Sequence, residues 1–339
     1  MLIYKDNTPR NKEFENLCVK TQEEMKELVI DELTNRNRGE VIIDDGFVMY
    51  VGMYPVLLCA HMDTVHGEKP RTFVYANGTI SSPQGIGGDD RCGIYMIFKI
   101  LEHYDCSVLF LEDEEVGCIG TKKFCANTIS QEYIDKFNFI VEYDRKGADH
   151  AVFYECDNKE FTKFITSGFF EEKEGTCSDI SYLAPKLNAA AVNLSCGYYD
   201  EHYLEHYVVL DEMETVIKES MKLIDKAKEL EKPFKFVQAP RKWGRYGYYG
   251  YGWDDYDDYY DSYYGRYYDN YSSTSNTLEG KLDKYAVEFI DIKIVDGNEV
   301  QFINDTVIEG KTLDDALLKF LKEYDYLPYS HVIEIYKTL

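Results

Sequence analysis

The stretch that decides the fold is residues 56–64, which read Val-Leu-Leu-Cys-Ala-His-Met-Asp-Thr. Its first five residues form a short, fully apolar run, which is typical of a strand buried on both faces. The run is followed by His61 and Asp63, and these side chains share a face because strand residues two apart point the same way. One of the two can therefore bind a metal ion while the other orients it from behind.

Polar motifs of the same kind recur after this stretch. A glycine-rich turn, Gly-Gly-Asp-Asp-Arg-Cys-Gly, occupies residues 87–93 before a helix predicted at 92–103. Glu-Asp-Glu-Glu-Val-Gly at 112–117 follows a buried strand predicted at 107–111, and Glu-Tyr-Asp at 142–144 ends a strand predicted at 137–142. A fifth candidate, His202, lies in a loop after a strand predicted at 190–194.

The order of strands and helices predicts an α/β fold. A capping-box pattern at 21–24 starts a helix, two strands at 41–43 and 47–51 flank a turn, and a helix is predicted at 121–127. A long amphipathic helix starts at Asp211, and we expect Pro233 to end it. We predict a three-layer α/β sandwich with a largely parallel central sheet, in which chemistry gathers at the carboxyl ends of the strands.

Each motif alone is weak evidence, but together they would meet at one edge of the sheet. Asp89 lies on a glycine-rich turn, where its two carboxylate oxygens could bridge two cations. Glu114 and Glu115 are adjacent acids that would resist ionising together. A cation that binds one of them would leave the other free as a base.

The wording and order of the motifs resemble the dinuclear zinc exopeptidase superfamily, which includes peptidase T, the glutamate carboxypeptidases and the zinc aminopeptidases. The peptidase T-like group shows similar signatures to His-Met-Asp-Thr at 61–64, Gly-Gly-Asp-Asp-Arg-Cys-Gly at 87–93 and Asp-Glu-Glu-Val-Gly at 113–117. The resemblance covers residues 40–232.

The resemblance implies a role for each of these side chains. His61 and Asp144 would hold one metal ion, and Glu115 and His202 the other. Asp89 would bridge the two ions, Asp63 would orient His61, and Glu114 would be the general base. Zinc is the expected metal, although carboxylate-rich sites also accept manganese or cobalt.

Four further residues are candidates near the site. His206 is the second choice to His202 as the last metal ligand; His202 is favoured because it is nearer to Gly197, and the family's last histidine lies in a glycine-led loop. Tyr199 could donate a hydrogen bond to substrate, although a packing tyrosine is the simpler interpretation. Ser178 and Asp179 are typical of a helix cap, and the related zinc aminopeptidases carry a similar Ser-Asp near the substrate.

The sequence departs from the family pattern in two places. Asp144 and His202 are only 58 positions apart, which leaves no room for the lid or dimerisation domain that peptidase T and the carboxypeptidases insert there. Arg91 replaces the usual lysine, and its planar fork hydrogen-bonds differently. The resemblance therefore carries over the reaction but not the substrate class.

Composition limits the function classes and the location. The chain of 339 residues has 37 basic and 62 acidic side chains, a net charge of −25, which disfavours nucleic-acid and anionic-membrane partners. No apolar run approaches the ~20 residues of a membrane span, and no secretory signal begins the chain. The nine cysteines include no C-x-x-C pair, so we expect reduced thiols and a cytoplasmic location.

The rest of the chain predicts a different organisation. Residues 1–232 form the expected metallopeptidase-like domain, and 233–281 a Tyr/Gly/Asp-rich low-complexity linker with twelve tyrosines between Tyr246 and Tyr271. The linker is interpreted as a disordered spacer, with a self-associating aromatic segment as the alternative. Residues 282–339 predict a small ββαβ unit with a hairpin turn at 296–298, a helix from Thr312 and a strand at 331–336.

These observations favour a metal-dependent amide hydrolase, an aminopeptidase that acts on short peptides. Deacylation of an N-acyl amino acid is the alternative within the enzymes. A catalytically degenerate scaffold or binding protein is the alternative outside them. A two-metal nuclease is a third option, which the negative charge disfavours.

Overall fold

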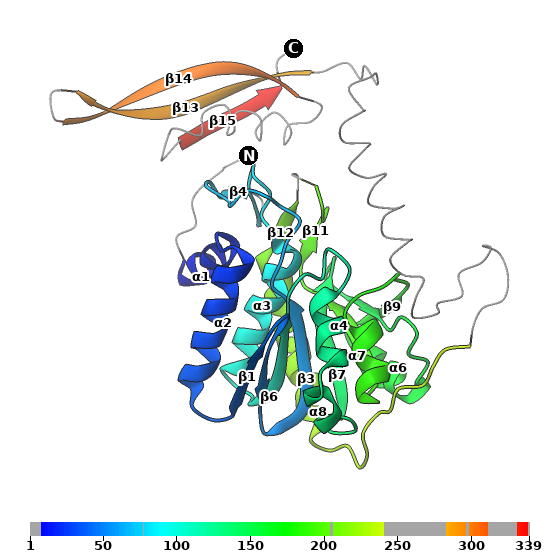
Figure 1. Cartoon of the computed structure of the whole chain (residues 1–339). Helices are drawn as coiled ribbons and strands as arrows, with labels where there is room; N and C mark the ends of the chain where they lie inside the picture. Colours follow the sequence, from blue (N-terminus) through cyan, green and yellow to red (C-terminus); the bar gives the residue numbers. More distant parts are fainter. Residues whose placement is uncertain are drawn as a thin grey trace.

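The computed structural model describes residues 8–76, 78–203 and 206–240, together with three strands at 283–295, 298–310 and 331–337. An eight-stranded sheet lies at the centre of the first part, with the strand order β1-β2-β6-β3-β7-β10-β8-β9 (Figure 1). Its strands are β1 (Glu40–Asp44), β2 (Phe47–Val51), β3 (Tyr54–His61), β6 (Cys106–Leu111), β7 (Phe139–Arg145), β8 (His150–Val152), β9 (Glu171–Lys173) and β10 (Ala191–Ser195).

The middle of this sheet is parallel, as the sequence predicts. Strand β3 pairs in parallel with β6 and β7, and β10 pairs in parallel with β7. Antiparallel partners β2 and β8 flank these four strands. The carboxyl ends of β3, β6 and β7 therefore lie side by side, and the motifs at 61–63, 112–117 and 142–144 emerge together.

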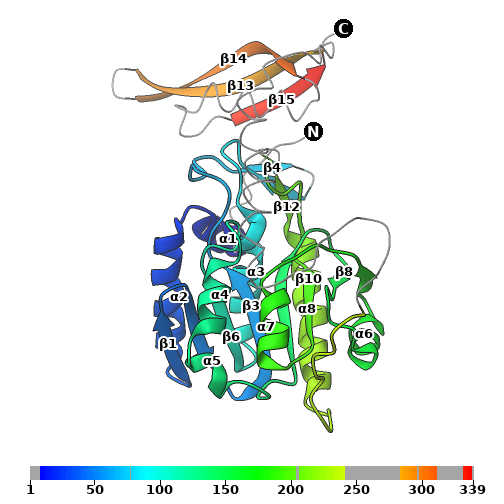
Figure 2. The same ribbon diagram turned by 45° about the vertical axis from the view of Figure 1, so that its right-hand side comes forward.

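Helices cover both faces of the sheet, which confirms the three-layer sandwich (Figures 1 and 2). In β3, Val56, Leu58 and Ala60 pack with the helices of one face, while Leu57 and Cys59 pack with those of the other. The first face carries α1 (Pro9–Cys18), α2 (Gln22–Arg36), α3 (Gly88–Leu101), α6 (Lys159–Thr166) and α8 (Leu210–Ala227). The second face carries α4 (Ile119–Ala126), α5 (Ile129–Glu132) and α7 (Ile180–Leu187).

Two helix ends show how well local sequence signals work here. The capping box is present, because the Thr21 hydroxyl accepts from the Glu24 amide at 3.2 Å and the Glu24 carboxylate accepts from the Thr21 amide at 2.9 Å. Helix α8, by contrast, ends at Ala227 and not near Pro233. The two residues that follow are exposed, and the Lys228 and Glu229 amides donate to Asp225 and Lys226, three residues back, so the chain leaves the α-helical pattern there.

A second, smaller sheet was not expected from the sequence. It contains β4 (Val74–Ala76), β5 (Thr79–Ser81), β11 (Tyr198–Tyr199) and β12 (Tyr207–Val209), in the order β11-β12-β5-β4. The antiparallel pair β11–β12 brackets the loop that contains His202. Pairing of β12 with β5 ties this loop to the segment that follows β3.

The last three strands form a separate antiparallel sheet in the order β14-β13-β15. Strands β13 (Asp283–Val295) and β14 (Asn298–Gly310) make the predicted hairpin, and β15 (His331–Lys337) adds to β13. The predicted helix from Thr312 and the tyrosine-rich segment lie outside the described residues. In the part that is described, no helix has the length and apolar character to cross a bilayer.

Candidate metal centre

His61, at the carboxyl end of β3, is held by Asp63. The Nδ1–H of His61 donates to Oδ1 of Asp63 over 3.1 Å. The same carboxylate accepts the amide N–H groups of Glu114 and Glu115, both at 3.0 Å. Asp63 therefore orients the imidazole and at the same time fixes the loop after β6 against β3.

The carboxylate of Asp89 lies between two histidines. Its Oδ1 is 3.0 Å from Nε2 of His61, and its Oδ2 is 3.7 Å from Nε2 of His202. Each histidine also faces one further carboxylate: Oδ1 of Asp144 is 3.6 Å from Nε2 of His61, and Oε2 of Glu115 is 3.2 Å from Nε2 of His202. His61 thus faces Asp89 and Asp144, and His202 faces Asp89 and Glu115.

These distances are of the size expected between ligands of a metal ion. Ligands that surround one zinc ion tetrahedrally at about 2.0–2.2 Å lie about 3.3–3.6 Å from one another. The separations to the two histidines, 3.0 and 3.6 Å at His61 and 3.7 and 3.2 Å at His202, bracket this range. The donor set of imidazole and carboxylate is also one that zinc, manganese and cobalt accept.

The pKa values of the clustered side chains also favour a bound cation. Burial and the charge of Asp89 raise the pKa of Glu115 to about 7, and burial and Asp89 raise the pKa of Asp144 to about 6. Hydrogen bonds to Asp89 and Glu115 raise the pKa of His202 to about 11. Without a metal ion, the raised pKa values mean that the crowded carboxylates hold protons more tightly and that His202 stays protonated. A divalent ion would supply the positive charge in place of these protons.

Two groups of side chains could each hold a metal ion: His61 with Asp89 and Glu115, and His61 with Asp144 and Asp90. The Asp90 carboxylate, however, accepts the amide N–H of His61 at 3.2 Å and that of Gly93 at 2.8 Å. Asp90 is fully buried, and these bonds join the start of α3 to the end of β3. We therefore assign Asp90 a positioning role. The Asp-Asp pair in the motif at 87–93 is the sequence feature that could have indicated this role.

Glu114 lies beside the cluster without belonging to either ligand group. Its amide is held by Asp63, and its Oε1 accepts a weak hydrogen bond from the Cys118 thiol at 3.6 Å. Burial, together with the charges of Asp144 and Asp179, raises the pKa of Glu114 well above its ordinary value. A carboxylate in this position is suited to accept and return a proton.

The structure brings His202, and not His206, to the carboxylates. The His206 ring is fully buried, with ring centroids 5.8 Å from His66 and 5.4 Å from Tyr198. Burial lowers the pKa of His206 to about 3. Within the described residues, His206 therefore packs behind the site and makes no ion pair with the cluster.

The two candidate substrate-binding residues have different surroundings. The Tyr199 hydroxyl donates to Glu212 at 2.5 Å, and its ring stacks on Tyr207 with centroids 5.1 Å apart. Asp179 is buried at the N-cap position of α7, but its side chain makes no capping bond, and instead Oδ1 accepts from the Thr121 hydroxyl at 2.5 Å. Burial raises the pKa of Asp179 to about 7.

Sequence reasoning missed two supports of the cluster, Tyr198 and Asn193, and named Arg91 without its partners. The Tyr198 hydroxyl donates to Oδ1 of Asp144 at 3.2 Å, and the Asn193 side chain bonds the Asp144 amide at 2.9 Å and its carbonyl at 3.0 Å. Arg91 is fully buried and donates to the carbonyls of Met62 at 2.7 Å and Lys20 at 3.1 Å. The planar fork of Arg91 therefore joins the end of β3 to the loop before α2.

Residues 145–201 contain no separate lid in this structure. They form β8, α6, β9, α7, β10 and β11, all within the two sheets and the layers that cover the larger one. The cluster is consequently flanked by the core, by the small sheet and by the loop after β3.

Comparison with known proteins identifies the fold. No protein-family model matches the sequence, and no curated protein matches it either. An aminopeptidase PepT structure from Bacillus cereus is similar with a TM-score of 0.54 and 13% identity over 65% of this chain and 98% of that chain. A tripeptidase from Staphylococcus aureus gives a TM-score of 0.51 and 12% identity, with the same coverage of 65% and 98%. The chain thus has the fold of these exopeptidases, as its motifs predict.

Proposed function

We propose that the chain is a metal-dependent peptidase, an aminopeptidase that acts on short peptides through a carboxylate-bridged centre of two divalent ions. The observation that carries the proposal is the position of Asp89. Its two oxygens face different histidines, and each histidine has its own second carboxylate. His61 and Asp144 would hold one ion, His202 and Glu115 the other, with zinc as the expected metal.

The proposed reaction is hydrolysis of an amide. Divalent ions held by these residues would supply Lewis acidity toward water and toward the substrate carbonyl. Glu114 takes the proton from the attacking water and returns it to the nitrogen of the leaving amine, so that one side chain serves as base and then as acid. Asp63 keeps the Nδ1–H of His61 engaged, so that Nε2 stays directed at the cluster.

A buried carboxylate oxygen without a partner supports a substrate with a free amino group. Asp179 lies near Glu114 and Asp144, and its Oδ2 is buried without a partner among the described residues. An ammonium group could donate a hydrogen bond to this oxygen, and an N-acyl group would lack that charged donor. We also propose a cytoplasmic location, because the nine cysteines of the sequence include no C-x-x-C pair.

Metal analysis followed by activity assays tests the proposal. We expect the purified protein to contain zinc and to hydrolyse aminoacyl-anilides, with activity lost in chelator and restored by the metal. Turnover of N-acetyl amino acids alone would favour the deacylase. A protein that binds no metal and shows no chelator-sensitive activity would favour the scaffold.

A further inference from the structure

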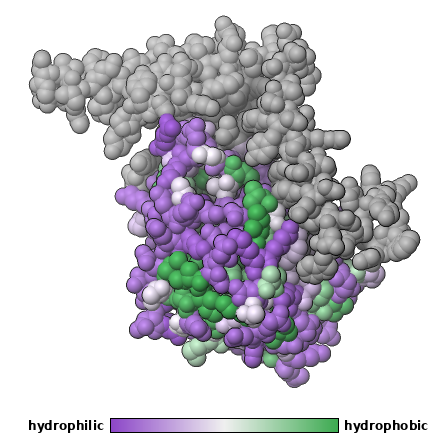
Figure 3. All heavy atoms as spheres, in the orientation of Figure 1, coloured by the Kyte–Doolittle hydropathy of each residue, from purple (hydrophilic) through white to green (hydrophobic). Residues whose placement is uncertain are grey.

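Exposed apolar side chains gather around the candidate centre. Seven large hydrophobic residues are exposed in the described part of the chain, and four of them follow closely on residues of the site loops. These four are Val65, Val116, Ile119 and Tyr203, with exposures of 38, 57, 36 and 60%. The face of the molecule in Figure 3 is largely hydrophilic, with a few apolar patches. Apolar side chains that gather at one place on such a surface can mark a binding site.

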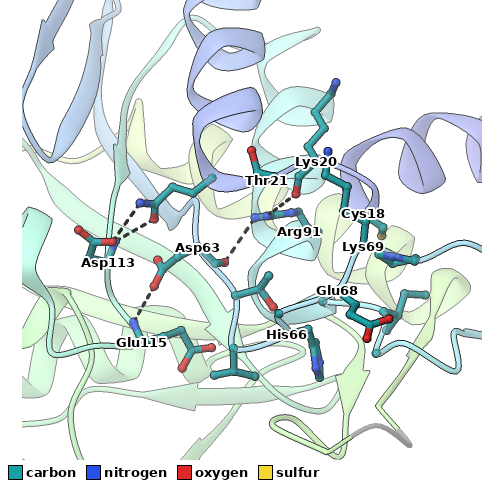
Figure 4. A pocket seen from close by; sticks show the side chains of 18 of the residues that line it. Cys18, Lys20, Thr21, Asp63, His66, Glu68, Lys69, Arg91, Asp113 and Glu115 are labelled. Carbon is teal, nitrogen blue, oxygen red and sulfur yellow. Dashed lines mark hydrogen bonds between the residues drawn. The ribbon is translucent and has the colours of Figure 1, made fainter.

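Two of the four line a cavity that begins at the cluster. The cavity has a volume of about 550 Å³, and Asp63 and Glu115 form part of its wall. Figure 4 shows these two carboxylates across the cavity from Glu68 and Lys69. Val65, Val116, Pro70 and Ile86 contribute apolar wall. A volume of this size accommodates a short peptide.

Most charged groups around the cavity already have partners. Lys69 pairs with Glu24 at 2.5 Å, and Glu68 pairs with Arg71 at 3.5 Å. Asp113 accepts from the Gln22 amide at 3.0 Å. These groups therefore do not require a charged ligand. Lys20 is the exception, since it lines the cavity with no ion pair among the described residues. An acidic side chain of the peptide could therefore bind in the cavity in place of an apolar one.

We propose that Val65 and Val116 form a specificity subsite for an aliphatic or aromatic side chain of the peptide, on a residue that adjoins the scissile bond. This inference rests on the proposed peptidase function. Val116 directly follows the proposed ligand Glu115, Val65 lies two residues after Asp63, and all four residues line the same cavity. A side chain in contact with both valines would bury them, whereas water otherwise contacts them.

The size of the selectivity follows from the apolar area that is covered. A leucine side chain has three more carbon atoms than alanine. Each methylene group that an apolar pocket buries contributes roughly a tenfold preference in kcat/KM. Because Val65 and Val116 are half exposed, the subsite is open on one side. We therefore expect leucine to exceed alanine by about 10- to 100-fold in kcat/KM.

Peptide series and four variants test the subsite. The metal-loaded full chain is assayed with X-Gly and Gly-X dipeptides, in which X is Ala, Leu, Phe, Glu or Lys. Val116→Asp inverts the character of the wall, and Val116→Thr keeps its shape while it removes one methyl group. Ile43→Thr and Met53→Thr are matched controls, because these side chains are 52 and 85% exposed away from the site.

The expected result is a preference for Leu and Phe in one series, reduced about 3- to 10-fold by Val116→Thr and lost in Val116→Asp, with bound metal unchanged. Equal rates for Leu and Ala, or a preference for Glu, would overturn the inference while leaving the peptidase function intact. If no peptide is hydrolysed, the proposed peptidase function is refuted, and the subsite is then tested by calorimetric binding of L-leucine and L-alanine. Tighter binding of leucine that Val116→Thr weakens supports the subsite. Equal binding of the two amino acids contradicts it.

Discussion

The most informative single substitution is Asp63→Asn, because Asp63 has three bonds and no proposed contact with metal. Its Oδ1 accepts from Nδ1 of His61 and from the Glu114 amide, and its Oδ2 accepts from the Glu115 amide. In the variant the amide oxygen can replace Oδ1, but the NH₂ group then opposes the Glu115 N–H. The chain loses one charge-assisted hydrogen bond and gains a donor that faces another donor.

The magnitude follows from these contacts. Loss of a hydrogen bond to a charged acceptor costs about 1.5–3 kcal/mol in the free energy of unfolding of the metal-free protein. Loss of the carboxylate that orients a metal-binding histidine weakens metal affinity by about 10–100-fold. Competition for zinc against a chromophoric chelator measures the second effect, and urea denaturation in chelator measures the first.

Asp113→Asn is the matched control. Asp113 lies on the same loop, where its carboxylate accepts from the Gln22 side chain at 3.0 Å, but it does not contact His61. We expect this variant to bind zinc as the native chain does. Unchanged zinc affinity in Asp63→Asn, or an equal loss in both variants, would refute the orienting role of Asp63.

Three further outcomes are expected. Glu114→Gln should lower kcat by about 100- to 10,000-fold with zinc content unchanged, since it removes the proton acceptor and no ligand; parallel loss of metal would contradict this role. In chelator, the free energy of unfolding should fall as the pH rises from about 5 to 9. The folded-state pKa values of Glu115 (about 7) and His202 (about 11) lie above their unfolded values, so the stability that their protonated forms contribute is lost at high pH. Urea titrations at pH 6 and 9 measure this change, and a rise in the free energy of unfolding would contradict it. Thr21→Ala should cost about 1 kcal/mol through loss of the cap of α2, whereas the exposed Thr34→Ala should change stability by less than about 0.5 kcal/mol; equal melting temperatures would oppose the capping account.

The central sheet and its ligand-bearing edge could be predicted because both depend on local patterns. The apolar run at 56–60 has the length and composition of a buried strand, and His61 and Asp63 follow it directly. Similar runs before 112–117 and 142–144 place further acids at the same edge. Parallel pairing then follows from the alternation of strands and helices.

The remaining features depend on contacts between distant segments. The strands of the small sheet are two or three residues long, too short to show a period. Its β12–β5 pairing brings together residues more than a hundred positions apart, and that pairing sets the loop of His202. The sequence favoured His202 over His206 only because His202 is nearer to Gly197. In the structure the two residues differ in their surroundings: His202 faces carboxylates, and His206 is buried among aromatic rings. The hydroxyl of Tyr198 reaches Asp144 only because β11 closes this hairpin.

The claim that two metal ions share Asp89 is tested most directly by calorimetric titration of the chelator-treated full chain with zinc. The account predicts two equivalents of zinc per chain in the native protein and at most one in Asp89→Ala, with Asp113→Asn as the native-like control. Binding of no zinc by the native chain, or of two equivalents by the Asp89→Ala variant with native affinity, would contradict it.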